Sequence, residues 1–223
     1  MIIKKMNKII FLLTIAVTAG CGQSSGKAPD VAGVLSSSNN DSCSSGGKCK
    51  IFVTNNNYNN GLVGNNTTFD LECNNDTAKP SGGGTYKALV MTASRKPPST
   101  NWVLYANRTY TRSDGSTIIG STNADAIFFG DTTLINSIVA LSDPRVWMTG
   151  IIVDHDGTWV TADGFNCTNF SSASSTIEFT YGKPAVSKDS WGFSFGPIQY
   201  VKCDGSENST ISVTNPHLLC VEQ

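Results

Sequence analysis

The chain has 223 residues, with 16 lysines and arginines against 17 aspartates and glutamates. Nucleic-acid binding needs a clustered basic surface, and a formal net charge of −1 at pH 7 provides none, so we expect no nucleic-acid partner. The length suits one folded domain with additional terminal segments.

The first segment combines a basic start with a short apolar run. Residues 9–17 are all apolar except Thr14, and three lysines precede them: Lys4, Lys5 and Lys8. A helix of nine residues is too short to cross a bilayer core of about 30 Å. This pattern is typical of a secretory signal peptide.

The next four residues, 18–21 (TAGC), resemble a bacterial lipobox, although Thr18 stands where leucine is commonest. In a lipobox the chain is cut before the cysteine, whose thiol carries diacylglycerol. We therefore expect residues 1–20 to be a signal peptide and Cys21 to attach the protein to a membrane, since two or more acyl chains anchor a protein stably. Gly22 is not the aspartate that retains some lipoproteins in the inner membrane, which favours the outer membrane or cell surface of a bacterium. The alternative is an ordinary cleaved signal peptide with a chance cysteine.

Residues 21–48 are rich in serine, glycine and asparagine and have little apolar surface to bury. We interpret them as a flexible tether with an r.m.s. reach of roughly 30 Å, followed by one domain over residues 49–223. Removal of the three N-terminal lysines leaves 13 basic against 17 acidic residues in the mature chain.

The domain shows strand patterns at both ends and a helix signal near its start. Residues 50–54 and 217–221 are apolar and predict strands, and residues 85–93 alternate in the manner of a third strand. Thr67 and Thr68 offer a helix N-cap, which predicts a short helix ending near Asp76. Short β segments separated by Asp-Gly turns follow, so the sequence predicts an α+β fold.

Seven cysteines are present, and lipidation of Cys21 leaves an even number. In an oxidising compartment an even set favours disulfides. Zinc is disfavoured because there is no C-x-x-C pair and the only histidines are His155 and His217. The six remaining cysteines are Cys43, Cys49, Cys73, Cys167, Cys203 and Cys220.

Five sequence segments in a fixed order resemble the C-type lectin-like fold, and within it the endostatin-like branch. They are DLEC (70–73), GGTYKALVMTASR (83–95), RVWMTG (145–150), FNCTNF (165–170) and LLCVEQ (218–223). The chain is also similar, from about residue 51 to its end, to a bacterial lipoprotein family of unknown function. The resemblance implies short helices packed on a twisted, mostly antiparallel sheet.

The resemblance also implies a disulfide pattern. Cys73 should pair with Cys220, and Cys167 should pair with Cys203 inside that loop. Cys43 and Cys49 lie outside the resemblance and are left to each other, with free thiols as the alternative.

The calcium-binding triplets of sugar-binding C-type lectins are absent, and the zinc-binding histidines of vertebrate endostatin have no counterpart. We therefore expect neither a cofactor nor a metal.

Function on this fold usually lies in a long loop region, which here runs from about residue 151 to residue 190. Asp154, Asp156, Trp159 and Asp163 mix acids with an aromatic, a composition expected of a protein-binding hot spot, and we predict that they form the ligand-binding site. For Trp159 a position in the core is the alternative. Asp154 and Asp156 are spaced as in half a calcium loop, but Phe165 stands where the loop needs glutamate. We interpret this motif as a β-turn, and a weak cation site completed by Asp163 is the alternative.

The other conspicuous residues have simpler interpretations. Trp147, in RVWMTG, matches a core tryptophan of the fold. A locally basic stretch is interpreted as a solvated face; its residues are Arg95, Lys96, Arg108 and Arg112.

No nucleophile is marked by its surroundings, so we expect a protein that is not an enzyme. The resemblance implies a binding module, an adhesin for host extracellular matrix or plasma proteins such as complement regulators. The alternative is a structural or interaction protein of the bacterium's own envelope.

Overall fold

The computed structural model describes residues 43–58, 64–82, 84–128, 133–154, 156–174, 178–191, 201–204 and 216–223. The expected signal peptide, Cys21 and most of the expected tether lie outside the described residues, as does His155. Within the described residues, no helix combines the length and the apolar composition that crossing a membrane requires.

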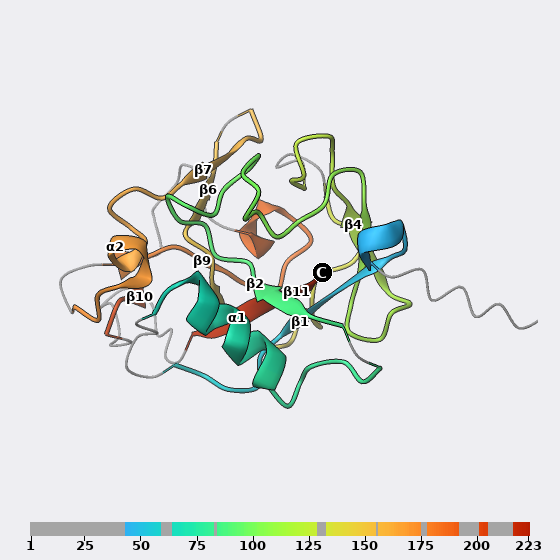
Figure 1. Ribbon diagram of the computed structural model, residues 1–223, viewed down its shortest axis with the longest axis horizontal. Helices are drawn as coiled ribbons and strands as arrows, with labels where there is room; N and C mark the ends of the chain where they lie inside the picture. The colour runs from blue at the N-terminus through green and yellow to red at the C-terminus, as the bar shows by residue number, and fades with distance from the viewer. Residues whose placement is uncertain are drawn as a thin grey trace, which may run out of the picture. The chain divides into compact units, whose positions relative to one another are not determined.

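The described strands form one larger, curled sheet and two small sheets of two strands each (Figure 1). The larger sheet has the strand order β4-β3-β1-β11-β5-β9, and β2 also pairs with β11. Its strands are β1 (Cys49–Val53), β2 (Tyr86–Ala88), β3 (Thr109–Thr111), β4 (Ile118–Ser121), β5 (Trp147–Met148), β9 (Tyr181–Gly182) and β11 (His217–Glu222). The small sheets pair β6 (Ile151–Val153) with β7 (Trp159–Thr161), and β8 (Glu178–Phe179) with β10 (Val201–Lys202).

Helices are few. They are α1 (Asn66–Asn75), the single turn α2 (Cys167–Phe170), and the 3-10 turns η1 (Cys43–Ser45) and η2 (Lys188–Ser190). In α2 all four residues have φ between +52° and +59°, so this turn is left-handed. The α+β class predicted from the sequence is confirmed.

The strands β1 and β11 lie in the middle of the sheet and separate two apolar clusters. Ile51 and Val53 of β1 belong to one cluster and Phe52 to the other. In β11, Leu219 and Val221 join the first cluster, while its other apolar residues join the second. Because both faces of these strands are covered, their sequences are continuous apolar runs rather than alternating ones. The strands predicted over 50–54 and 217–221 are confirmed.

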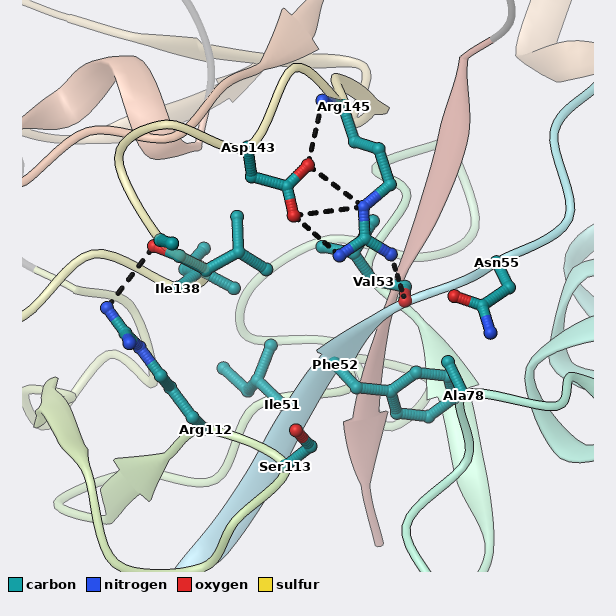
Figure 2. A pocket seen from close by; sticks show the side chains of 12 residues that line it. Ile51, Phe52, Val53, Asn55, Ala78, Arg112, Ser113, Ile138, Asp143 and Arg145 are labelled. Atoms are coloured by element: carbon teal, nitrogen blue, oxygen red, sulfur yellow. Dashed lines mark hydrogen bonds and ion pairs between the residues drawn. The ribbon is translucent and has the colours of Figure 1, made fainter.

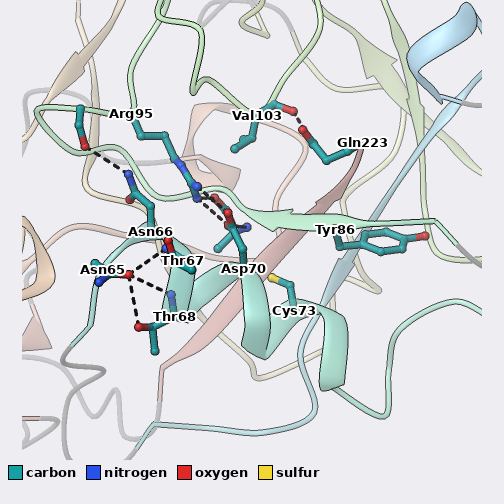
Figure 3. A network of polar contacts seen from close by, with 12 residues as sticks. Asn65, Asn66, Thr67, Thr68, Asp70, Cys73, Tyr86, Arg95, Val103 and Gln223 are labelled. Carbon is teal, nitrogen blue, oxygen red and sulfur yellow. Dashed lines mark hydrogen bonds and ion pairs between the residues drawn. The ribbon is translucent and has the colours of Figure 1, made fainter.

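Helix α1 begins earlier than its threonines predict. Asn65 is the N-cap, and its side-chain oxygen accepts hydrogen bonds from the backbone N–H groups of Thr67 (2.9 Å) and Thr68 (3.1 Å) (Figure 3). The expected cap at Thr67 and Thr68 is therefore wrong, because asparagine caps a helix at least as well as threonine and precedes them. The helix packs against β2 and β11 through the buried side chains of Phe69 and Cys73.

An ion pair fastens α1 to the segment after β2. Arg95 is only 4% exposed, and its two terminal nitrogens donate to the carboxylate oxygens of Asp70 at 2.8 and 2.7 Å (Figure 3). Arg95 also donates to the carbonyl of Ala88, whose N–H donates to Asp70. Arg95 is therefore not part of a solvated basic face, and that expectation is wrong for this residue.

The strand predicted over residues 85–93 is present only as β2, from Tyr86 to Ala88. The N–H of Val90 donates to the carbonyl of Ala88 (2.9 Å), a tight turn that interrupts the ladder. The predicted alternation nevertheless holds, because Tyr86, Ala88 and Val90 enter the cluster under α1. Leu89 enters the opposite cluster.

Three disulfides close the described domain. They join Cys43 to Cys49, Cys73 to Cys220 and Cys167 to Cys203, and the latter two are the pairs that the resemblance implies. Cys43 is buried within η1, so residues 43–48 belong to the folded part, ahead of the boundary expected at residue 49.

Candidate ligand-binding site

The hairpin of β6 and β7 carries the predicted acidic residues Asp154 and Asp156 at its tip. Asp154 donates its backbone N–H to the carbonyl of Thr158 (2.8 Å), and the Asp156 carboxylate accepts from the Thr158 N–H (2.9 Å). Gly157 between them has φ of +83°, a conformation that favours glycine. The predicted β-turn is confirmed, and Asp156 shapes it.

Asp163 lies at the other end of the same hairpin. The register pairs Val153 with Trp159 near the tip and Ile151 with Thr161 near the base, and Asp163 follows Thr161. At about 3.3 Å per residue, Asp163 is more than about 10 Å from Asp154. The alternative of a cation site completed by Asp163 is therefore wrong. Among the described residues, no group of three or more histidines, cysteines or acids is placed to hold a metal.

Trp159 is buried, so it takes the core position that was one of the two alternatives for this residue and is not an exposed aromatic. Its side chain is 5% exposed, and its ring centroid lies 5.4 Å from that of Trp191 and 6.1 Å from that of Trp102. The register places Trp159 opposite the buried Val153, whereas Val160 faces outward and is 39% exposed. A period of two does not reveal which face of a short hairpin turns inward.

A pocket of about 230 Å³ opens beside Trp159, and we call it the hairpin pocket. It is formed where three segments meet: the Pro-Pro segment before Trp102, the turn at 123–127 and the tip of the hairpin. Its lining residues are Pro97, Pro98, Asn123, Asp125, Ile127, Gly157, Thr158 and Trp159.

The turn at 123–127 is held by its own asparagine and by a tryptophan. The side-chain oxygen of Asn123 accepts from the N–H groups of Asp125 (3.0 Å) and Ile127 (3.1 Å). The indole Nε1 of Trp102 donates to the carbonyl of Ala126 (2.7 Å). These contacts leave Asp125 exposed at the rim of the hairpin pocket, while Ile127 is buried.

A second pocket of about 280 Å³ lies between β1 and the loop at 137–145 (Figure 2). Arg145 donates to the Asp143 carboxylate (2.6 Å) and to the carbonyl of Val53 (3.2 Å). The hydrogen bond from the Arg145 side chain to Asp143 holds the pKa of Asp143 below its ordinary value. Arg112 donates through Nε to the carbonyl of Ser137 (2.8 Å). Both guanidinium groups are thus used to hold the loop against the sheet, and we assign this pocket a structural role.

Of the four predicted contact residues, only Trp159 lines the hairpin pocket, while Asp154 and Asp156 lie at the hairpin tip beside the lining residue Gly157. The structure adds Asp125 and the two prolines, which no sequence pattern marks as contact residues. No local pattern could have found them, because their proximity to the hairpin depends on the packing of Trp102 against Trp159.

The matched family model covers residues 55–186, more than half of the chain, and describes a protein of unknown function, DUF1554. The chain belongs to this family. The match contains the hairpin pocket, helix α1 and Cys73 and Cys167, but ends before Cys203 and Cys220. Among curated proteins, none matches the chain. This match is consistent with the resemblance to a family of unknown function. The description of DUF1554 assigns no activity.

Proposed function

We propose that this DUF1554 protein is an exported bacterial lipoprotein whose folded domain acts as a non-enzymatic binding module at the cell envelope. One observation carries the proposal: a signal-peptide pattern ending in Cys21 precedes a domain closed by three disulfides. Disulfides persist in oxidising compartments, which an exported chain reaches.

The nested pairs Cys73–Cys220 and Cys167–Cys203 support the C-type lectin-like, endostatin-like assignment, since that resemblance implies both pairs. The assignment in turn favours an adhesin that binds a host matrix or plasma protein. The outer membrane or cell surface is the location that such a role requires.

The hairpin pocket is the surface that we assign to partner binding. It combines an aromatic, prolines and an exposed acid in one hollow, whereas the guanidinium groups of the second pocket are used internally. The sequence lacks the calcium-binding triplets of sugar-binding C-type lectins, so we expect this binding not to depend on calcium.

The test is equilibrium binding of the mature full-length protein, in detergent micelles, to immobilised matrix proteins and complement regulators. We expect saturable binding to at least one of them, with an affinity that EDTA does not change. Binding only to components of the bacterium's own envelope would overturn the adhesin role, and loss of binding in EDTA would overturn the assigned site.

A further inference from the structure

The backbone of β7 alternates between groups that face β6 and groups that face away from it. The N–H of Asp154 donates to the carbonyl of Thr158 (2.8 Å), which fixes these two residues as a hydrogen-bonded pair. In an antiparallel ladder such pairs alternate with pairs whose N–H and C=O groups point away from the partner strand. Val160 is therefore bonded to β6, whereas the backbone groups of Trp159 and Thr161 point to the other side.

Most of these outward-pointing groups are unpaired. The carbonyl of Thr161 accepts the N–H of Asp163 (2.8 Å). The N–H of Thr161, and both the N–H and the C=O of Trp159, make no hydrogen bond with any residue that the structure describes. Unpaired donors and acceptors along a strand form a template for a further strand.

The open side of β7 is the outer side of the hairpin, next to the hairpin pocket. Ile151 and Val153 of β6 are fully buried, whereas Val160 of β7 is exposed. The lining of the pocket includes Pro97 and Pro98. Because proline has no backbone N–H, these two residues cannot donate to the carbonyl that the edge leaves open.

We propose that an extended segment of the partner protein adds to β7 as a further strand and places one apolar side chain in the hairpin pocket. The proposal rests on the proposed binding function and names the way in which the partner is recognised. Main-chain hydrogen bonds to a sheet edge give affinity, and pockets for alternate side chains give specificity.

The register decides which side chain enters. The residue opposite Trp159 exchanges two hydrogen bonds with it, and directly paired residues place their side chains on the same face of a sheet. Its side chain therefore points inward, towards the apolar lining formed by Pro97, Pro98 and Ile127. Its two neighbours in the added strand point outward, on the face of the exposed Val160.

The test is an NMR titration of the mature full-length protein in detergent micelles with a capped heptapeptide, one leucine between two runs of three threonines. We expect the backbone amide resonances of Trp159 and Thr161 to shift saturably, and that of Val160, which already bonds to β6, to shift less. The matched control peptide carries N-methyl-leucine, which has no N–H to donate to Trp159. It should require at least about threefold higher concentrations, as expected for the loss of one hydrogen bond.

Two variants at one position test the edge itself. Thr161→Pro removes an N–H that the folded protein does not use, and proline is tolerated at the open side of an edge strand. It should weaken binding of the leucine peptide at least about threefold. Thr161→Val keeps the N–H and should bind the peptide as the wild type does. The amide spectrum of each variant shows whether the domain is folded.

The strand-addition proposal is overturned if the leucine peptide shifts neither amide, or if both peptides bind equally well. It is also overturned if a folded Thr161→Pro binds the leucine peptide as tightly as Thr161→Val. None of these results bears on whether a matrix or plasma protein binds, because that is measured separately on immobilised proteins. The two proposals therefore fail by different measurements.

Discussion

His217, at the start of β11, is the clearest titrating group of the core. It is 8% exposed, and its Nδ1 lies 2.8 Å from the carbonyl oxygen of Thr54, so this nitrogen must carry the hydrogen. Burial lowers the pKa of His217 below 6.5, its ordinary value, although the hydrogen bond to Thr54 opposes that shift. The folded protein therefore disfavours the charged form of His217 relative to the unfolded chain.

Acidification should destabilise the protein through this residue. Below about pH 6.5 the unfolded chain binds a proton at His217 that the folded chain resists, so the free energy of unfolding falls as pH decreases through this range. Urea unfolding at pH 7.5 and pH 5.5 measures the loss. In His217→Asn the loss should be smaller, and an identical loss in that variant would contradict the assignment.

Trp159 is a core residue whose removal cannot serve as a binding test. Trp159→Ala should cost about 3–5 kcal/mol of unfolding free energy, because it leaves a cavity beside Trp102 and Trp191. Trp159→Phe should cost much less, since the lost Nε1 has no hydrogen-bond partner and an aromatic ring remains. Urea unfolding measures the loss of unfolding free energy in both variants. Equal losses would show that the cavity is not the main cause of the destabilisation.

At this scale the sequence predicted residue types better than their orientation. The acids at the hairpin tip and the aromatic beside them were predicted, and the core position of Trp147, which is 0% exposed, was as well. For Trp159 the sequence left a core position and a surface contact open, because the strand register that decides between them depends on packing against distant residues. Asp125 lacked any local signal, since its importance comes only from lining the same pocket as Trp159.

Helix α1 is held to the sheet by the pair of Asp70 and Arg95, which is an element-scale contact. Asp70→Asn should lower the free energy of unfolding by about 3 kcal/mol, because it leaves the guanidinium of Arg95, which is 4% exposed, without its counter-charge. Asp189→Asn is the control, since Asp189 pairs with Lys183 at 3.5 Å in a largely exposed position. This variant should lose less than about 1 kcal/mol of unfolding free energy.

A double-mutant cycle with Arg95→Met completes this test. If the pair acts as a unit, the double variant loses at least about 1 kcal/mol less than the sum of the single variants. If the losses of unfolding free energy, measured in urea, are additive, the two side chains do not stabilise the fold as a unit.

Elements with strong local patterns were predicted, and those that depend on long-range pairing were not. The apolar runs of β1 and β11 and the capped helix α1 need only their own sequences to be identified. Strands such as β5 and β9 have two residues each, so pairing with distant segments defines them rather than periodicity. The left-handed turn α2 has no sequence signal, because it contains none of the glycines that usually adopt positive φ.

For the whole domain, the outer disulfide should make the largest single covalent contribution to stability. Cys73 and Cys220 are 147 positions apart, and in the loop-closure model such a bridge stabilises by about 5 kcal/mol. The Cys43–Cys49 bridge closes only six positions and should contribute about 2 kcal/mol. Melting temperatures of the two paired Cys→Ser variants, compared with the wild type under oxidising conditions, should fall in that order. The reverse order would contradict the loop-closure explanation.

The central claim is that a lipid on Cys21 holds this domain at a bacterial membrane. The most direct measurement is Triton X-114 phase partition of the protein expressed in a bacterium, for wild type and for Cys21→Ala. We predict that the wild type enters the detergent phase, since two or more acyl chains anchor stably. Cys21→Ala should remain an uncleaved or unacylated precursor and should not partition as the wild type does. A variant that partitions like the wild type would contradict the claim.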